Sequence, residues 1–352
     1  MNWKKPIGAG TAVVLSVLLS GCGDTGPAQE LETVRVMDAG VGIIYFSTYL
    51  AQERGYFEDE GVNVELLGGT AGGQDVTAAL VSGDADVIQA TLGNVIATRE
   101  QGLDLRAIAP IMEINAVSLV VRNDVIAKLG VSDDASPEEK MAALAKYGAK
   151  VGISSAGSGT DTFMRGVCKK YNVNCDTELQ LVALGGMGEN QAAFQQGQID
   201  AVARSHPDVD ILGATSDGSV FIGADELAAD GGYLHSVLIT RDATIDGSRD
   251  KLVAFLRAIA KAMIYAQTFP DETEKFVHKQ VDPDLDDAVF GAAWKTLKAG
   301  IPSDPVIDKE DVDNYYALER DIAGKEPAVA EEDIINTDLA TEAQDAVADF
   351  KP

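Results

Sequence analysis

Two similar stretches, "AALVSGDADV" at residues 78–87 and "AAFQQGQIDA" at residues 192–201, decide the fold. In each stretch an Ala-Ala-apolar run ends at a glycine, and an aspartate three residues later leads into small apolar residues. Glycine readily takes the left-handed backbone conformation that ends many helices. We therefore predict that a helix ends at Gly83 and another at Gly197, and that a strand begins at the aspartate that follows each of them.

Strand-like and helix-like segments alternate around both stretches. Strand patterns lie at residues 33–40, 62–67, 85–90 and 105–111, and again at 150–155, 179–184 and 200–205, with helical patterns between them. Such alternation predicts a mostly parallel sheet that is covered by helices and carries its binding loops at the carboxyl ends of the strands. Because the pattern starts twice, we predict two α/β units with one copy of the stretch in each.

Two short β-rich runs connect the units. We interpret "AVSLVVRN", residues 116–123, and "LHSVLITRD", residues 234–242, as crossover strands that together form a hinge. The predicted fold class is therefore α/β, with two doubly wound domains joined by two crossover strands. We expect the two domains to be lobe 1, residues 33–120 and 236–352, and lobe 2, residues 121–235.

The first 22 residues differ from the rest of the chain. A lysine pair precedes an apolar run, and small residues stand before Cys22. The run is short for a bilayer span, and its end resembles a bacterial lipobox, in which acyl chains such as palmitate are attached to the cysteine. We therefore expect a signal peptide at residues 1–21 and a lipidated tether at residues 22–32. The folded part would be held at a membrane, on the periplasmic or extracellular face of the cell envelope.

The charge balance and the remaining cysteines limit the partners. The chain has 56 acidic and 28 basic residues and a net charge of −28, which excludes nucleic acid as a natural partner. In an exported protein, Cys168 and Cys175 either close a small loop as a disulfide or stay as two free thiols. Two cysteines without a nearby histidine cluster make a zinc site improbable, so we expect no metal and no cofactor.

Four segments carry a resemblance to a known family: "YLAQERGYFEDEGVNVEL", "GGQDVTAALVSGDADV", "VGISSAGSGTDTF" and "AAFQQGQIDAVARSHPD". From about residue 33 to residue 340 the chain resembles the periplasmic substrate-binding proteins of ABC importers. Within them it is similar to the branch that contains nitrate, taurine, alkanesulfonate and thiamine-pyrimidine-precursor binders. The resemblance implies the two-lobed type II binding-protein fold, closure on a small ligand, an ABC permease and its ATPase as partners, and no catalysis. We expect a monomer.

Polar and Gly-rich loops before helices are the candidate ligand contacts. In "SSAGSGTDTF", residues 154–163, backbone amides and hydroxyls precede a helix start, where partial positive charge collects. N-capping by Thr160 or Asp161 would explain the same residues without a ligand. Arg204 could pair with an anionic head group or form a surface salt bridge. Tyr45 and Tyr233 could stack on a planar ligand or belong to the core.

Other candidates are side chains at the ends of predicted strands, among which we interpret His206 as more structural than acid-base active. The full set of candidate ligand-binding residues is Asp38, Tyr45, Gly69, Thr70, Thr91, Asn94, Glu113, Ser155, Ser158, Gly159, Thr160, Met187, Arg204, His206 and Tyr233. Acidic groups beside Arg204 and many hydroxyls fit a zwitterion, an amine-bearing sulfonate or a neutral heterocycle at least as well as a bare inorganic anion.

The sequence thus indicates an extracytoplasmic solute-binding lipoprotein. It would capture a small polar organic molecule, which is sulfonate-like or taurine-like, zwitterionic or pyrimidine-like, between two lobes and deliver it to an ABC importer. A ligand-binding sensory subunit without a transporter would share the fold. An enzyme similar to the fungal thiamine-pyrimidine synthase is the other alternative, but the Cys-rich iron-binding run of that branch is not in this sequence.

Overall fold

The computed structural model describes residues 31–38, 42–68, 73–132, 134–227, 234–281, 283–324 and 326–352. The expected signal peptide and most of the tether, including Cys22, lie outside the described residues. Three candidate ligand-binding residues, Gly69, Thr70 and Tyr233, also lie outside them. The fold is therefore described from Leu31 onward.

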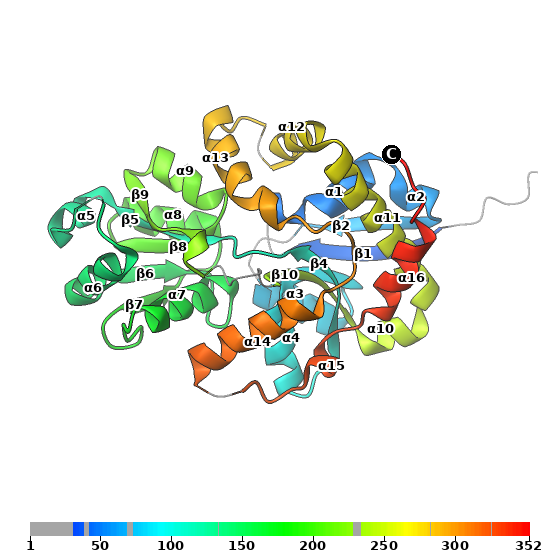
Figure 1. Ribbon diagram of the computed structural model, residues 1–352, viewed down its shortest axis with the longest axis horizontal. Helices are drawn as coiled ribbons and strands as arrows, with labels where there is room; N and C mark the ends of the chain where they lie inside the picture. Colours follow the sequence, from blue (N-terminus) through cyan, green and yellow to red (C-terminus); the bar gives the residue numbers. More distant parts are fainter. Residues whose placement is uncertain are drawn as a thin grey trace, which may run out of the picture. The chain divides into compact units, whose positions relative to one another are not determined.

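Five strands form sheet A, at the right of Figure 1, in the order β2-β1-β3-β10-β4. The strands are β1 (Glu32–Asp38), β2 (Val62–Leu67), β3 (Val87–Thr91), β4 (Leu105–Met112) and β10 (Ser236–Arg241). β1 pairs in parallel with β2 and β3, whereas β10 lies antiparallel between β3 and β4.

Sheet B, at the left of Figure 1, repeats this arrangement in the order β7-β6-β8-β5-β9. Its strands are β5 (Val117–Arg122), β6 (Lys150–Ile153), β7 (Gln180–Ala183), β8 (Ala201–Ser205) and β9 (Gly218–Ile222). β6 pairs in parallel with β7 and β8, and β5 lies antiparallel between β8 and β9. The two sheets therefore share one topology, and the predicted α/β fold class is confirmed.

Each of the two connecting runs lies wholly in one sheet. β5 pairs only with sheet B and β10 only with sheet A among the described strands, so the chain crosses in the segments that precede them. The first crossing joins Met112 to Val117, and the second lies between Ile222 and Ser236. The boundary expected at residue 120 falls inside β5, because a strand-like composition does not tell which sheet a strand will join.

Helices cover both faces of both sheets, and short 3-10 helices η1 (Ile43–Tyr45), η2 (Ala224–Leu227) and η3 (Lys298–Gly300) join some of them. Around sheet A lie α1 (Phe46–Glu53), α2 (Tyr56–Asp59), α3 (Gly73–Ser82), α4 (Leu92–Glu100), α10 (Asp242–Gly247), α11 (Arg249–Thr268), α12 (Pro270–Val281), α13 (Asp287–Leu297), α14 (Lys309–Ala323), α15 (Glu331–Ile334) and α16 (Asp338–Ala346). Around sheet B lie α5 (Asn123–Leu129), α6 (Pro137–Tyr147), α7 (Gly159–Lys170), α8 (Met187–Gln195) and α9 (Asp208–Thr215).

The repeated stretches have the same structure in both halves. α3 ends before Gly83 and α8 ends before Gly197, and both glycines have positive φ, at 85° and 67°. An arginine from the antiparallel strand of the same sheet lies over each glycine, Arg241 over Gly83 and Arg122 over Gly197. The predicted helix ends are confirmed, and a side chain at either glycine would meet a guanidinium group.

The aspartate of each stretch ties two parallel strands together. The Asp86 carboxylate accepts a hydrogen bond from the backbone N–H of Arg35 at 3.0 Å. The Asp200 carboxylate accepts one from the backbone N–H of Lys150 at 2.9 Å. Each aspartate therefore satisfies a backbone donor of the neighbouring strand, β1 in sheet A and β6 in sheet B.

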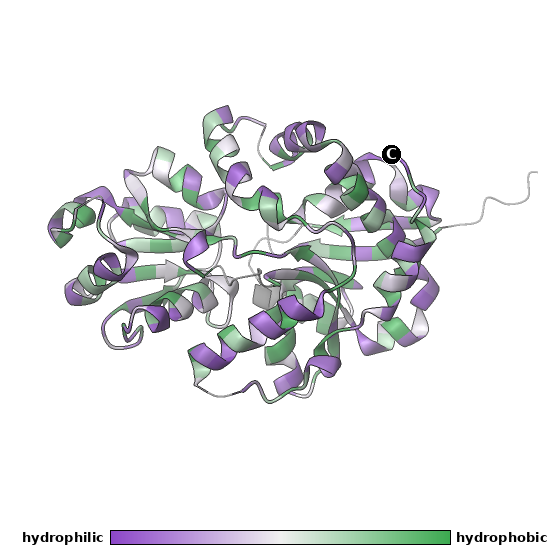
Figure 2. Ribbon diagram, viewed as in Figure 1, coloured by the Kyte–Doolittle hydropathy of each residue, from purple (hydrophilic) through white to green (hydrophobic). Residues whose placement is uncertain are grey.

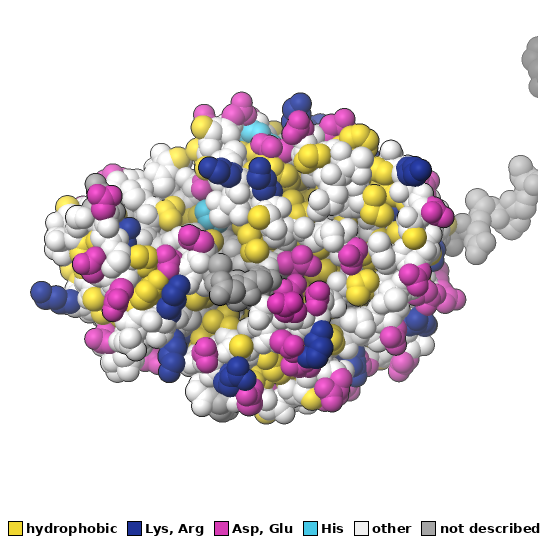
Figure 3. All heavy atoms as spheres, viewed as in Figure 1, with side chains coloured by type: hydrophobic (Ala, Val, Ile, Leu, Met, Phe, Trp, Pro, Cys, Tyr) yellow, Lys and Arg dark blue, Asp and Glu magenta, His cyan; other side chains and the backbone are white. Residues whose placement is uncertain are grey.

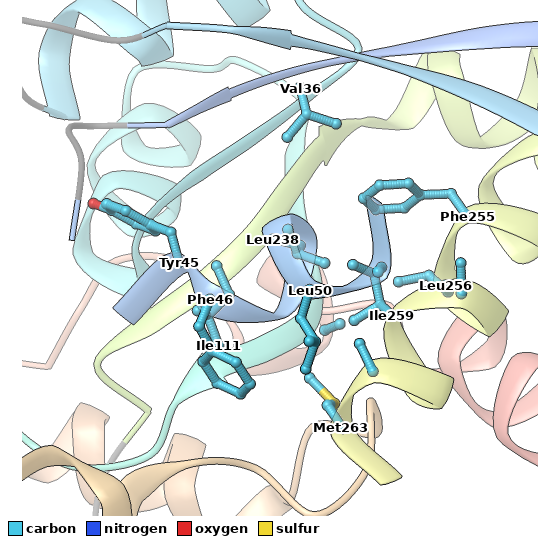
Figure 4. Close-up of a cluster of buried hydrophobic side chains, with 14 of the residues drawn as sticks. Val36, Tyr45, Phe46, Leu50, Ile111, Leu238, Phe255, Leu256, Ile259 and Met263 are labelled. Carbon is cyan, nitrogen blue, oxygen red and sulfur yellow. The ribbon is translucent and has the colours of Figure 1, made fainter. Parts of the chain in front are cut away.

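The largest buried cluster fills the space between sheet A and the helices α1 and α11. Figure 4 shows Leu50 of α1 and Ile259 and Met263 of α11 packed together, with Leu238 of β10 nearby. Burial of apolar side chains in this amount is the main favourable term in folding. Tyr45 lies at the margin of the cluster, and its hydroxyl points away from it.

Hydropathy follows the layers of the fold. Figure 2 shows apolar residues concentrated in the strands and polar residues on the outer faces of the helices. Among the described residues no single helix is long and apolar enough to span a membrane. One pair of helices, α11 with α12, has the length and composition of a span when taken together, but the pair is bent by 116°.

Cys168 in α7 and Cys175 form a disulfide, with their Cα atoms 5.8 Å apart.

Gly152 in β6 is a test of the packing in sheet B. A Cβ at this position would lie 2.5 Å from Asn190 Oδ1 and 2.7 Å from Ile199 Cδ1, and both neighbours are buried. We expect Gly152→Ala to lower the free energy of unfolding by about 1–3 kcal/mol through overpacking. Gly291 in α13 has no atom within 4 Å of such a Cβ, so Gly291→Ala is the matched control. The control should be neutral or more stable by about 1 kcal/mol, and equal urea midpoints for the two variants would contradict the packing argument.

Candidate functional site

The carboxyl edge of each sheet, where its parallel strands end, faces the other sheet. The chain leaves sheet A at the end of β4 and enters sheet B beside Ser205, which ends β8. Only residues 113–116 connect Met112 to Val117, and these five residue steps span at most about 18 Å. The two carboxyl edges must therefore lie close together, and the candidate residues at strand ends lie on them.

Asp38 ends β1 on the carboxyl edge of sheet A. Its side chain is 4% exposed and accepts a hydrogen bond from the Tyr49 hydroxyl at 2.6 Å and a second one from the Gln89 amide. Burial raises the pKa of Asp38 to about 6, although the two donors partly offset this effect. Asp38 is thus a buried carboxylate that is held by neutral groups.

Tyr45 comes from η1, next to this carboxylate. It is buried, and the pKa of its hydroxyl is raised, first by burial and then by the negative charge of Asp38. Arg204 of sheet B acts in the opposite direction on the same hydroxyl. The structure therefore brings Tyr45 within electrostatic reach of candidate residues from both sheets.

The loop after β6 is held by its own hydroxyls. The Thr160 hydroxyl accepts a hydrogen bond from the Ser154 backbone N–H at 2.9 Å, and the Ser158 hydroxyl donates to the Ser155 carbonyl at 2.7 Å. Asp161 accepts from the Gly157 backbone N–H at 2.8 Å. Most of these polar side chains are thus used within the loop. Neither Thr160 nor Asp161 is the N-cap of α7, since that position is Ser158, which makes no side-chain capping hydrogen bond.

The guanidinium group of Arg204 forms hydrogen bonds and an ion pair that connect the ends of three strands of sheet B. It forms an ion pair with Asp208 at 2.7 Å and donates to the Ser154 hydroxyl at 2.7 Å and to the Gly185 carbonyl at 3.3 Å. Ser154 follows β6, Gly185 follows β7 and Arg204 lies in β8. Of the two alternatives for Arg204, the structure has an ion pair, and the guanidinium also fixes the neighbouring loops.

Thr91 and Asn94 mainly bind each other. Asn94 Oδ1 accepts from the Thr91 backbone N–H at 3.2 Å and from the Thr91 hydroxyl at 2.8 Å, which caps α4. The Thr91 methyl group faces sheet B, because a Cβ on Gly159 would lie 3.1 Å from Thr91 Cγ2. The same Cβ would lie 3.2 Å from His235 Cε1, so the first turn of α7 contacts sheet A residues in this conformation.

His206 is buried between two partners. Its Nε2 lies 3.0 Å from the Ser118 hydroxyl and its Nδ1 lies 2.6 Å from Asp210 Oδ2. These contacts agree with the structural interpretation of His206. Met187 begins α8, at the start of the helix that follows β7, and is partly exposed.

Acidic groups gather beside the first crossing. Burial and the negative charges of Asp311, Asp304 and Asp308 raise the pKa of Glu113 to about 7. Asp311 in α14 is 8% exposed, and burial with neighbouring charges raises its pKa to about 6. Figure 3 shows acidic side chains spread over the visible face, with a group of them near the middle of the view.

The C-terminal helices also contact sheet B helices. α13 packs against α9, and α14 packs against α7. Gly166 of α7 lies close to this second contact, since a Cβ there would come within 2.9 Å of Leu227 and 3.4 Å of Leu318. The sheet A and sheet B halves therefore touch on both sides of the candidate site in this conformation.

A small pocket of about 200 Å³ lies beside the site, between α4, α7 and α14. It contains none of the candidate ligand-binding residues. Within the described ranges, no group of three or more His, Cys, Asp or Glu side chains is placed to hold a metal ion.

Sequence reasoning missed several residues that shape the site. Tyr49 and Gln89 hold Asp38, Asp208 holds Arg204, and Asp311 lies beside Glu113. Asp208 follows Arg204 by only four residues, but Arg204 lies in β8 and Asp208 begins α9, so the helical spacing rule does not indicate this pair. The other three are far from their partners in the sequence, so no local pattern indicates them.

Comparisons with solved structures show the same fold. A protein of Bordetella bronchiseptica RB50 matches with a TM-score of 0.74 at 22% identity, over 91% of this chain and 100% of that chain. The periplasmic nitrate-binding protein NrtA from Synechocystis PCC 6803 matches with a TM-score of 0.70 at 16% identity, over 92% of this chain and 91% of that chain.

The alkanesulfonate-binding protein SsuA from Xanthomonas axonopodis pv. citri, solved with bound MOPS, matches with a TM-score of 0.67 at 16% identity, over 90% of this chain and 99% of that chain. A search of the curated proteins finds no match. The fold is thus that of the periplasmic binding proteins, and the resemblance noted in the sequence is confirmed. The model of the NMT1-like family matches residues 44–280, about two thirds of the chain, and the chain therefore belongs to the NMT1-like family.

Proposed function

We propose that this protein is the solute-binding component of an ABC importer and that it captures a small polar organic molecule outside the cytoplasm. The single observation that carries the proposal is the apposition of two carboxyl edges of identical topology, each with polar side chains at its strand ends. Open α/β sheets bind ligands at such edges. The nitrate-binding and alkanesulfonate-binding proteins of the same fold support the same general role.

The proposed site lies between two lobes that can move relative to each other. We propose lobes that follow the expected ones except at the first boundary, which we place before β5 because that strand pairs within sheet B. The second boundary stays at the start of β10. Asp38, Tyr45, Thr91 and Glu113 would contact the solute from lobe 1, and the loop after β6 would contact it from lobe 2. These contacts coexist only when the lobes are closed, so the solute shifts the equilibrium toward the closed form. A permease then recognises that form.

The proposed ligand class follows from the polar groups on both edges. Sulfonate-like or taurine-like, zwitterionic and pyrimidine-like molecules each match part of the set, because carboxylates, hydroxyls and backbone amides lie on the opposed edges. Binding and release are the whole of the proposed activity.

We also propose that Cys22 carries a lipid that anchors the protein to a membrane. Acyl chains contribute about 0.8 kcal/mol for each buried CH₂ group, so several chains hold a protein firmly. Expressed in a bacterial host, the unaltered full-length chain should enter the detergent phase in a Triton X-114 partition. The Cys22→Ser variant should remain in the aqueous phase or keep its signal peptide. Equal partition of the two proteins, with the signal peptide removed from both, would contradict the anchor.

Gly159 is a test of lobe closure. We expect Gly159→Ala to weaken binding of a solute found by thermal-shift screening about tenfold, because its Cβ presses on Thr91 and His235 and about 1–2 kcal/mol of strain arises only on closure. Solution scattering should show less compaction on binding, while the melting temperature of the free protein stays nearly unchanged.

Thr91→Ser supplies the matched rescue. This change removes the methyl group that the new Cβ would meet and keeps the hydroxyl that Asn94 accepts from. The double variant Gly159→Ala with Thr91→Ser should recover part of the lost affinity. If scattering by the unaltered protein showed no change at saturating solute, the closure mechanism would be wrong.

A further inference from the structure

We infer that the solute carries a positively charged nitrogen and that Asp38, positioned by Tyr49 and Gln89, is the group that binds it. The inference rests on the proposed function and narrows its ligand class to cations and zwitterions. It concerns one end of the solute only.

The surroundings of Asp38 differ from those of Asp86 and Glu60, two carboxylates of the sheet A half that have cationic partners. Asp86 is paired with Arg35 at 2.8 Å, and Glu60 is paired with both Arg257 and Lys261. Asp38 has only a phenol and an amide as partners in the described part of the chain. A buried carboxylate without a cation is costly to a protein, so a missing positive charge is the distinguishing feature of this site.

Gln89 gives a second, independent indication. Gln89 lies opposite Asp38 in the parallel pairing of β1 with β3, and its amide nitrogen donates a hydrogen bond to the Asp38 carboxylate. Its Oε1 is fully buried and has no hydrogen-bond partner among the residues that the structure describes. A carboxylate offers about four lone-pair positions, of which two are used here, and an unpaired amide oxygen adds two more.

The network therefore lacks donors rather than acceptors. An ammonium group brings three N–H donors and a positive charge and needs no acceptor of its own. A sulfonate, carboxylate or nitrate group would bring further acceptors and negative charge to a place that already holds a buried carboxylate. The shortage of donors and the shortage of positive charge thus point to the same chemical group.

The charges around the site agree with this assignment. Glu113 and Asp311 add negative charge on the sheet A side, and Asp208 already neutralises Arg204 on the sheet B side. The groups next to Asp38 are Tyr49 of α1, Gln89 of β3 and Tyr45 of η1, none of which is charged at neutral pH. Opposite charge within about 4–6 Å favours the ionised carboxylate, so a bound ammonium would stabilise the charged form of Asp38.

Binding should consequently depend on pH in one direction. The pKa of Asp38 in the free protein is raised to about 6 by burial, so the carboxylate is ionised above that pH and protonated below it. A cation binds the ionised form, and affinity should fall by up to about tenfold for each pH unit below 6.

The experiment compares solutes that differ in one amine. The probes are taurine with ethanesulfonate, β-alanine with propionate, and an aminomethylpyrimidine with its hydroxymethyl counterpart, measured by calorimetry at pH 8. In at least one pair the amine should bind at least tenfold more tightly, and Asp38→Asn should weaken its binding at least tenfold while changing the binding of its partner less than threefold. Equal binding within every pair that binds would overturn the inference and leave the proposed function standing.

A stability measurement tests Asp38 without any solute. Asn in place of Asp38 can still accept from Tyr49, and its amide can donate to Gln89 Oε1 once the Gln89 amide rotates. At pH 8 the Asp38→Asn variant should therefore melt at a higher temperature than the unaltered protein, because a buried charge without a counterion is removed.

Glu60→Gln is the matched control. Glu60 is a half-buried carboxylate of the sheet A half, but it has two cations as partners, and they hold its pKa below its usual range. This variant should melt at a lower temperature and bind every probe as the unaltered protein does. If Asp38→Asn also melted at a lower temperature, Asp38 would be a satisfied structural residue and the inference would be wrong. Binding of none of the six probes would contradict the proposed ligand class, and the melting comparison would still decide the role of Asp38.

Discussion

The structure depends on one constraint, the antiparallel insertion of β10 into sheet A and of β5 into sheet B. A strand that runs antiparallel to its neighbours enters a sheet at their carboxyl edge. Ser236 accordingly pairs with Thr91 at the end of β3, and Val117 pairs with Ser205 at the end of β8. Both crossings therefore begin and end at carboxyl edges, and the short first crossing holds these edges together. Asn115 reinforces the arrangement, since its amide donates to Val117 in one crossing and to Ala224 in the other.

The sheets could be predicted from the sequence because their signals are local. A glycine at a helix end and an aspartate at a strand start act within a few residues, and both copies of the stretch adopted the predicted form. The first boundary was expected inside β5, because membership of a sheet is decided by pairing with residues eighty or more positions away. β9 and the helices after α11 were not anticipated from the sequence. Their places depend on contacts such as those of α13 with α9 and α14 with α7.

The candidate site could be predicted in outline but not in its partners. Topology alone places Asp38, Thr91 and Arg204 at strand ends, because carboxyl edges are where loops of successive strands meet. What each side chain does there depends on its neighbours. From its position at a strand end alone, Arg204 could bind an anion. In the structure, Asp208 and two loop oxygens occupy its guanidinium group. Asp38 is the opposite case, because its partners in the described part of the structure are neutral and no cation there balances its charge.

The paired state of Arg204 and the unpaired state of Asp38 both follow from the net charge of −28 on the chain. With twice as many carboxylates as cations, the partly buried arginines Arg35, Arg204 and Arg257 all have acidic partners. Asp38 is buried without a cation among the described residues, and side chains that depart from ordinary pairing in this way concentrate at functional sites. Stability alone would favour an uncharged residue at position 38. A bound cation would form with Asp38 the ion pair that the free protein lacks. This interaction would stabilise the closed, occupied state relative to the free state, and a binding protein needs such a difference for closure to depend on the solute.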